Sequence, residues 1–584
     1  MFFQELTRLF TAYAENSALQ STALKAAMIM QTLLLQKPHQ RSKTKDHSTH
    51  LECRLKLWAQ GSLDELLSES RTIQQKAMRA QKGVHPPQVL ARSFAKLMMQ
   101  GKVKAALRLI DSESNGGPLQ LESRVDPSKT ETVRDILLLK HPPKQPPKPS
   151  AIVTTEAPPT EVHPVLFENI DGQLIQKVAL KVEGVAGPSG LDAASWKRLC
   201  SSYKSSSSDL CSAIASIAKK LCTNYVDPQS ISAFTACRLI ALDKKPGVRP
   251  IGIGETIRRI VNKAIALALR DDIQDAAGAL QVCAGQLSGC EAAVHAMHKI
   301  FESPETEAAI LVDASNAFNS LNRQVALHNI HHLCPSLSKI LTNTYQEDID
   351  LYIDGETIYS QEGTTQGDPL AMAMYAIAIR PLINHLQSES LKQIWYADDA
   401  AAGGELSDLK AWWDQLIQLG PDYGYYPNAS KSWLVVKEDH LTAAEAIFSD
   451  SGISITNEGR RYLDGAIGTR LFVEMYAREK ISKWVQEVEL LSSIATSQPH
   501  AAYTAFTHGL MNKWNFLTRT IPNTELGGLG ISNPCKQCTG KFRASESVTA
   551  PLTNLILQQS HSYPAEVKAK QINAQNNTRA ERRC

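Results

Sequence analysis

The chain has 584 residues but no run of about 18 consecutive apolar residues, the length that a membrane-spanning helix needs. Its N-terminal stretch, MFFQELTRLFTAYAENSALQ, has charges among apolar residues at helical spacing, a pattern typical neither of a signal peptide nor of a membrane anchor. These absences favour a soluble, intracellular protein without a membrane partner. They do not distinguish nucleus from cytoplasm.

The cysteines form no disulfide framework. Eleven are scattered along the chain, and Cys200, Cys211 and Cys222 recur at intervals of about three helical turns, as buried thiols on one helix face would. Cys535 and Cys538 are half of a zinc site, but no second CxxC and no nearby Cys-His pair completes it. The pattern favours ordinary thiols, and whether Cys535 and Cys538 bind zinc stays open.

Phosphate-binding glycine motifs are also missing. There is no GK[ST] loop, and the pair Gly252 and Gly254 lacks the third glycine of a dinucleotide-binding loop. The formal net charge is only +3, yet eight Lys or Arg residues stand against two acids between Arg238 and Arg270. This local excess predicts a phosphate-facing patch that includes Arg249, Arg258 and Arg259, with a solvated helix face as the alternative.

Length and composition predict a folded chain of two or more domains. Hydrophobic residues make up 43% and charged residues 21%, which excludes wholesale disorder. The segment KHPPKQPPKPSAIVTTEAPPTEVHP is rich in proline and predicts an extended, semi-rigid linker. We expect, in order, a helical N-terminal region (1–112), a Pro-rich linker (113–164), a main domain (165–480), a second helical region (481–549) and a polar, frayed tail (550–584).

Two adjacent acids, Asp398 and Asp399, stand out in the stretch LKQIWYADDAAAGG. The apolar residues before them favour a strand, and the small residues after them allow a tight hairpin. Like charges at a hairpin tip repel each other unless a cation lies between them, so the stretch suggests a metal site. The pair Asp271 and Asp272, in contrast, lies in an ordinary helical pattern.

Three further stretches share this character. In LVDASNAFNSLNR a strand, 309–312, delivers Asp313; in EGTTQGDPLAMAMYAIAIRPL, Gln366 and Gly367 precede a long apolar helix; and GYYPNASKSWLVVK places Lys431 before another strand. In this order, with the stretch YADD, they resemble motifs A to D of reverse transcriptases. The closest resemblance is to the non-LTR retrotransposon type, related to the group II intron enzymes. Upstream, ALDKKPGVRPIGIGETIRRIVNKAI and GPSGLDAASW resemble fingers segments, so that about 165–470 is covered.

The resemblance implies an α+β fold, a right-hand polymerase with fingers, palm and a short thumb behind the helical N-terminal region. The implied reaction is RNA-templated DNA synthesis, with an RNA template, a DNA or RNA primer and dNTPs as partners; protein partners are not indicated. Nucleotidyl transfer of this kind uses two Mg²⁺ ions roughly 3.5–4 Å apart, and Mn²⁺ can replace them. Asp313, Asp398 and Asp399 would hold these ions.

The resemblance also assigns a nucleotide pocket. Phe318 corresponds to the bulky residue under the sugar that excludes a 2′-hydroxyl group, with a plain core phenylalanine as the alternative. Gln366 and Gly367 would shape the nucleotide and template pocket, because glycine permits close backbone approach.

Basic residues complete the implied site. Arg249, together with Lys244 or Lys245, would hold the β and γ phosphates as fixed charges. Lys431 is the candidate acid for the departing pyrophosphate, with a simple charge contact as the alternative.

The sequence departs from a complete element in several places. FLTRTIPN runs almost directly into TELGGLGISNP, where helical sequence is expected, so the thumb is predicted to be truncated. No endonuclease, RNase H or zinc knuckle is recognisable. Two alternatives therefore stay open: a decayed or domesticated nucleic-acid-binding protein, and an RNA-directed RNA polymerase, although the latter usually carries Gly-Asp-Asp where this chain has Ala397, Asp398 and Asp399.

Overall fold

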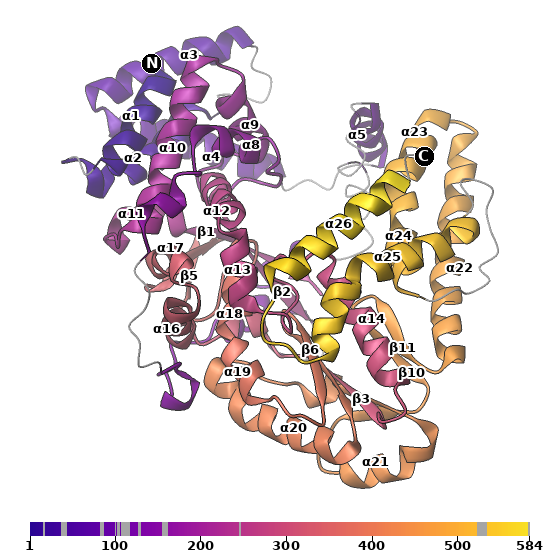
Figure 1. Cartoon of the computed structure of the whole chain (residues 1–584). Coiled ribbons are helices and arrows are strands. Elements are labelled where there is room, and N and C mark those ends of the chain that lie inside the picture. The colour runs from indigo at the N-terminus through magenta and orange to yellow at the C-terminus, as the bar shows by residue number, and fades with distance from the viewer. Residues whose placement is uncertain are drawn as a thin grey trace.

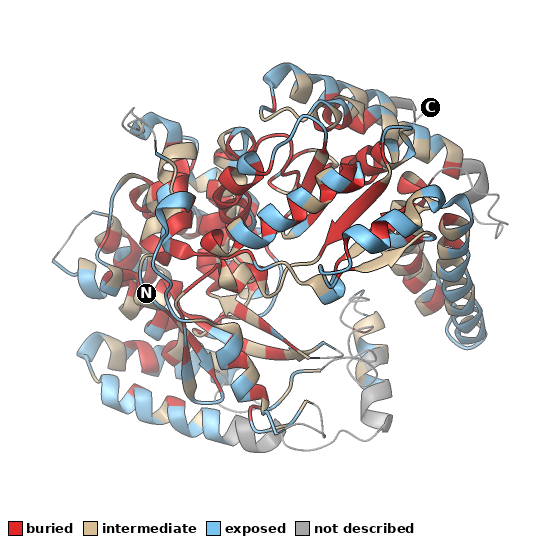
Figure 2. Cartoon of the chain, turned by 90° about the horizontal axis from the view of Figure 1, so that it is seen from below, coloured by how far each residue is buried: buried red, intermediate tan, exposed pale blue. Residues whose placement is uncertain are grey.

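The computed structural model describes residues 1–15, 18–36, 44–81, 87–99, 101, 106, 117–125, 130–154, 162–244, 247–521 and 534–581. Over these residues the fold mixes helices with three separate sheets. Buried residues gather in the sheets and in the helices that cover them (Figure 2).

The N-terminal region is helical where it is described. Its helices are α1 (Phe2–Ala14), α2 (Gln20–Leu34), α3 (Thr44–Gln60), α4 (Leu63–Gln81) and α5 (Pro87–Met99). One face of α1 carries its buried apolar residues and packs on α10 (Ser205–Thr223) (Figure 1). Cys211 and Cys222 lie on α10, but Cys200 lies on the preceding helix, so the prediction of three thiols on one helix face is wrong for Cys200. Phe10 stacks on Trp196 with 6.5 Å between ring centroids. The N-terminal helices therefore share a core with the segment that follows.

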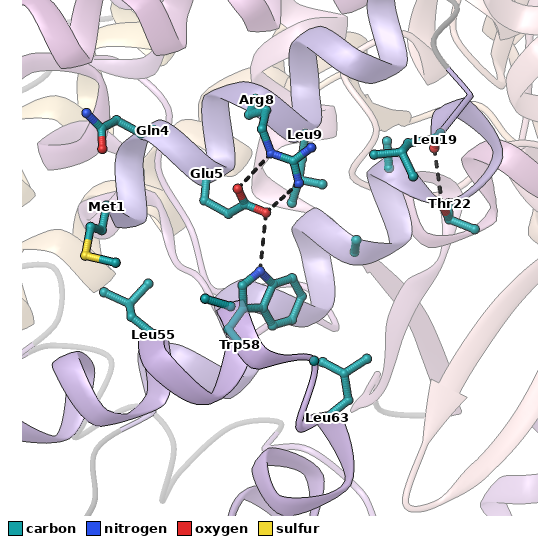
Figure 3. Close-up of a pocket in the computed structure, with 14 residues that line it drawn as sticks. Met1, Gln4, Glu5, Arg8, Leu9, Leu19, Thr22, Leu55, Trp58 and Leu63 are labelled. Atoms are coloured by element: carbon teal, nitrogen blue, oxygen red, sulfur yellow. Dashed lines mark hydrogen bonds and ion pairs between the residues drawn. The ribbon is translucent and has the colours of Figure 1, made fainter.

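A pocket of about 890 Å³ opens between α1, α2 and α3 (Figure 3). The Glu5 carboxylate accepts hydrogen bonds from Arg8 and from the Trp58 indole at its rim, and Leu9 and Leu55 contribute apolar wall. None of the residues that the sequence assigns to chemistry lines this pocket.

The first sheet has the strand order β2-β1-β4-β5. Its strands are β1 (Cys237–Asp243), β2 (Val248–Gly254), β4 (Ile349–Ile353) and β5 (Glu356–Ser360). The predicted hairpin turn at Asp354 and Gly355 is confirmed, and both residues have positive φ angles, as a tight turn of this type requires. Buried and exposed residues alternate along β1 and β2, so one face of this sheet is open to solvent.

The second sheet has the order β6-β7-β3-β8-β9. Its strands are β3 (Ala308–Val312), β6 (Lys392–Tyr396), β7 (Asp399–Gly404), β8 (Trp433–Val436) and β9 (Ser454–Thr456). Successive residues of β3 point to opposite faces, where α14 (Gly289–Glu302) and α20 (Leu406–Leu419) form separate apolar clusters with them. The central strand is therefore buried on both sides. A two-stranded ribbon, β10 (Gly459–Tyr462) and β11 (Gly465–Gly468), lies beside this sheet.

The remaining helices of the central part connect and cover these sheets. They are α8 (Gly172–Ala179), α9 (Ala193–Ser201), α11 (Pro228–Thr235), α12 (Thr256–Ala268), α13 (Arg270–Ala277), α15 (Ala317–Ser320), α16 (Arg323–Leu333), α17 (Pro335–Tyr345), α18 (Ala371–Ala378), α19 (Arg380–His385) and α21 (Leu441–Ile447).

The C-terminal part is a group of helices: α22 (Arg470–Ala495), α23 (Pro499–Ala505), a π-helical turn (Phe506–Leu510), α24 (Met511–Thr520), α25 (Pro534–Leu557) and α26 (Ala565–Glu581). In Figure 1, α25 lies along α14, which joins this group to the second sheet. The expectation of a frayed tail is wrong for the described residues, because Leu552, Ile556 and Tyr563 are buried in the same cluster as α14. The side chain of Cys535 and the stretch 522–533 lie outside the described residues, so the truncated thumb stays a prediction.

The predicted linker is not a free spacer. Residues 142–148 form neither helix nor strand, and α7 (Val133–Lys140) precedes them. Hydrogen bonds and ion pairs hold the segment along the central part; Leu119 N–H donates to Ala241, for example, and Lys148 pairs with Asp422. Burial of Val133 and Leu137 stabilises α7 there. In the part of the chain that the structure describes, no helix is both long and apolar enough to cross a membrane.

Candidate active site

Three predicted carboxylates lie at one edge of the second sheet. Asp313 follows the last residue of β3, and β3 pairs with β7 in the register that places Val312 opposite Ala400. The β6–β7 hairpin pairs Tyr396 with Asp399, so Asp398 lies in its two-residue turn. The sheet register therefore brings Asp313, Asp398 and Asp399 together, although they are far apart in sequence.

The small residues after the acids form β7 rather than the turn. They are needed because α14 packs closely on this strand: a Cβ atom added to Gly403 would come within 2.4 Å of Ile300 Cγ2. The run of alanines and glycines thus lets a helix approach the strand that begins with Asp399.

A buried glutamine fixes the turn. Ala397 has a φ angle of 56°, a left-handed conformation that is unfavourable for a residue with a Cβ atom. Gln281 Oε1 accepts from the Ala397 N–H at 2.8 Å, and Gln281 Nε2 donates to the Ala397 carbonyl at 3.0 Å. The Tyr425 hydroxyl donates to the Asp398 carbonyl at 2.9 Å. Sequence patterns did not indicate Gln281 or Tyr425, because nothing local predicts their hydrogen bonds to Ala397 and Asp398.

The carboxylates shift each other's titration. Burial first, and then the neighbouring Asp313, raise the pKa of Asp398, while Lys244 and Arg249 act in the opposite direction. Burial together with Asp398 and Asp313 raises the pKa of Asp399 to about 7, against the effect of Arg461. Asp399 is exposed to solvent at the start of β7. The edge holds negative charge at an energetic cost, as a cation site would.

Among the described residues no group of three or more His, Cys, Asp or Glu side chains is arranged as a ready metal site. The donor set still fits Mg²⁺, which takes few protein carboxylates and completes its shell with phosphate oxygens and water. Mutual repulsion at Asp398 and Asp399 is the observation that supports this fit.

Predicted cations lie beside the carboxylates. Lys244 and Arg249, at the β1–β2 hairpin, are exposed, and both act on the pKa of Asp398. Lys431 ends a short 3-10 turn (Ala429–Lys431) whose position is fixed by Asp313: Asn428 N–H donates to the Asp313 carbonyl at 2.8 Å. Lys245 lies outside the described residues.

A fourth cation was not predicted. Lys140, the last residue of α7, is half-buried. Its carbonyl oxygen accepts a hydrogen bond of 2.8 Å from Nδ2 of Asn316, the residue three positions after Asp313. Burial first, and then the charges of Lys244, Lys431 and Arg249, lower the pKa of Lys140. The proline-rich segment was expected to be a linker, so its sequence gave no reason to place a residue here.

The predicted nucleotide residues lie against α18 and β2. The Phe318 ring is half-buried and stacks on Tyr375 of α18, with 4.7 Å between centroids. Gln366 is half-buried and Gly367 is exposed with a φ angle of 106°, where a Cβ atom would lie 3.2 Å from the Gly252 carbonyl. The loop before α18 therefore approaches the β2 backbone closely at Gly367, and the role of Gly367 in a nucleotide pocket stays a prediction.

The prediction of a phosphate-facing basic patch is wrong for Arg258 and Arg259. Arg258 is buried, and its guanidinium pairs with Asp368 at 2.5 Å. Arg259 donates to backbone carbonyls of Glu183 and Val185 and is half-buried. Both residues lie on α12, whose buried face the pattern of charges alone did not reveal. Of the three arginines expected to face phosphate, only Arg249 is exposed.

The match to a protein family agrees with this geometry. Residues 242–467 match the family model of the reverse transcriptase (RNA-dependent DNA polymerase), a range that runs from β1 through β11 and includes the carboxylate edge. A search of curated proteins gave no match. The matched residues are thus similar to a reverse transcriptase domain, and the match supports a nucleotidyltransferase acting with a nucleic-acid template and primer.

Proposed function

We propose that the chain is an RNA-directed DNA polymerase of a retroelement, of the non-LTR type, with a right-hand layout of fingers, palm and thumb. The observation that carries the proposal is the convergence of Asp313, Asp398 and Asp399 at one sheet edge, beside cations from separate chain segments. The family match of residues 242–467 supports it.

The proposed reaction transfers a nucleotidyl group from a dNTP to a primer 3′-hydroxyl on an RNA template. Asp313, Asp398 and Asp399 would hold two Mg²⁺ ions, which when bound lower the pKa of the attacking hydroxyl and neutralise charge on the triphosphate. The residues of the chain orient the reactants: Lys244 and Arg249 bind the β and γ phosphates. Lys431 holds a proton close to the leaving pyrophosphate.

Phe318 would select deoxynucleotides. Its stacking on Tyr375 restricts the ring, and the short helix that carries it begins four residues after Asp313. A ring held beside the sugar of the incoming nucleotide would exclude a 2′-hydroxyl group by contact. Gln366 and Gly367, in the loop against β2, would form the adjoining wall of the nucleotide pocket.

Primer extension on an RNA template with Mg²⁺ tests the proposal. Asp398→Asn removes a metal ligand, and the loss of several kcal/mol of transition-state stabilisation should lower the rate by about a thousandfold. Asp271→Asn, at an exposed position in the first turn of α13, is the matched control and should extend at the wild-type rate. Equal rates for the two variants would contradict the assignment of the carboxylates.

The same assay separates the other candidates. A decayed protein that only binds nucleic acid would bind primed RNA in a salt-dependent manner, because neutralised phosphates release counterions, but would give no product. An RNA-directed RNA polymerase would extend with NTPs in preference to dNTPs.

A further inference from the structure

The segment before the family-matched region reaches the carboxylate edge through α7. Thr132 caps the helix with Asp135 in a reciprocal capping box, and Arg134 pairs with Glu356 at the tip of the β4–β5 hairpin at 2.8 Å. Apolar contacts of Val133 and Leu137 seat the helix on the central part. The amino-terminal end of α7 is therefore fixed on the first sheet.

The carboxyl-terminal end of α7 is fixed on both sides of Lys140. Asn316 donates to the Lys140 carbonyl at 2.8 Å, and His141 Nδ1 lies 2.8 Å from the Leu137 carbonyl. Further on, Gln145 N–H donates to the Glu362 carboxylate at 2.6 Å. These contacts restrict the Lys140 Cα atom to a place close to motif A.

The charged neighbours of Lys140 are cations. Lys244, Arg249 and Lys431 are the groups that act on it, and among the described residues it forms no ion pair. Four positive charges from three chain segments (α7, the β1–β2 hairpin and the turn at Lys431) thus gather next to three carboxylates. Lys244 and Arg249 also stabilise the Asp398 carboxylate, but the cations still repel Lys140, and a multiply charged anion bound between them would offset that repulsion. A polyphosphate has that chemistry, and lysine is suited to it as a compact charge.

We propose that Lys140 is a phosphate ligand of the incoming nucleoside triphosphate, supplied to the polymerase site by the segment that precedes the family-matched domain. The inference rests on the proposed function, which it deepens. It makes α7 part of the nucleotide site, joined to motif A by the Asn316 hydrogen bond. The rival role is structural: a lysine in the last turn of a helix stabilises the helix dipole.

Steady-state extension by the full chain tests the proposal. Lys140→Gln should raise the KM for dNTP by about tenfold, the usual cost of one charge-assisted hydrogen bond, and change kcat much less. Lys140→Arg restores the charge and should recover most of the loss. Lys148→Gln is the matched control, since this lysine lies on the same segment and pairs with Asp422; its KM should remain within about twofold of wild type.

Binding of inorganic tripolyphosphate with Mg²⁺, measured by calorimetry on the full chain, gives a readout that does not need extension. Lys140→Gln should weaken this binding and Lys148→Gln should not. If the wild-type chain extends no primer, the proposed function fails, but the tripolyphosphate comparison still decides the role of Lys140. Unchanged KM and unchanged tripolyphosphate affinity in Lys140→Gln, or weaker binding of primer-template alone, would overturn the proposal.

Discussion

The buried pair of Arg258 and Asp368 gives the sharpest prediction about stability. The two side chains are each 2% exposed, and the Asp368 carboxylate also accepts from Asn262 Nδ2 at 2.8 Å and from the Tyr345 hydroxyl at 3.0 Å. Burial by itself would lower the pKa of Arg258, but the adjacent Asp368 raises it above its ordinary value. Among the residues that the structure describes, Asp368 is therefore the one carboxylate that pairs with this guanidinium.

Asp368→Asn keeps the shape of the side chain and removes its charge. Breaking a buried ion pair leaves an uncompensated charge in the core, so the free energy of unfolding should fall by about 3–5 kcal/mol. Arg258→Met removes the other charge, and the double variant should be more stable than the sum of the single effects predicts, by about 2 kcal/mol or more. Primer extension should fall with Asp368→Asn as well, because Asp368 follows Gln366 and Gly367.

Urea unfolding of the full chain measures these differences. The control is Asp414→Asn in the pair of Lys410 and Asp414, which lie one helical turn apart on α20 with Asp414 56% exposed. Such a surface pair contributes about 0.5 kcal/mol or less. The reasoning fails if Asp368→Asn costs no more than Asp414→Asn, or if the Arg258 and Asp368 variants are simply additive.

Three further predictions concern the carboxylate edge and the nucleotide pocket. An aspartate in an unfolded chain has a pKa of about 4, whereas Asp399 has a pKa of about 7 in the fold. Without divalent metal, the stability of the fold should therefore fall as the pH rises from about 4 to 7. Thermal melts of Asp399→Asn over this pH range should lack that decrease. Gln281→Leu removes both hydrogen bonds to Ala397 and should lower the free energy of unfolding by about 1–3 kcal/mol for each unsatisfied backbone group. Gln393→Leu, at another buried glutamine, is the comparison for loss of a polar group from the core. A loss of extension without any loss of stability would contradict the role of Gln281 in holding the turn at Ala397. Phe318→Ala should admit ribonucleotides, and an unchanged ratio of extension efficiencies for dGTP and GTP would leave Phe318 as a core residue stacked on Tyr375.

The sequence predicted several local features correctly. A short apolar run that is buried on both faces ends at Asp313, and the hairpin at Asp354 and Gly355 forms as its turn residues indicate. Cys200, Cys211 and Cys222 are buried as predicted, although Cys200 lies on a different helix from the other two. Local patterns determine these features because each depends on burial or backbone conformation over a few neighbouring residues.

The order of the motifs predicted which acids belong together, but the pairing of β3 with β7 and of β6 with β7 brings them to one edge. The pattern of charges predicted a basic surface incorrectly where the tertiary structure buries a charged residue. Arg258 counted as part of a basic surface, yet its partner Asp368 lies in a distant segment and makes burial favourable. The sequence shows charges but not which of them will face each other in the core.

The sequence by itself determined the identity and spacing of the chemical groups: Asp313, Asp398 and Asp399 after strands, and basic residues in the fingers segment. Only the tertiary structure decided what supports them. Gln281 holds the strained turn at Ala397, and Lys140 arrives from a segment whose prolines predicted a spacer. The physical reason is that these contacts join residues far apart in sequence, whose free energy depends on packing and register rather than on local preference.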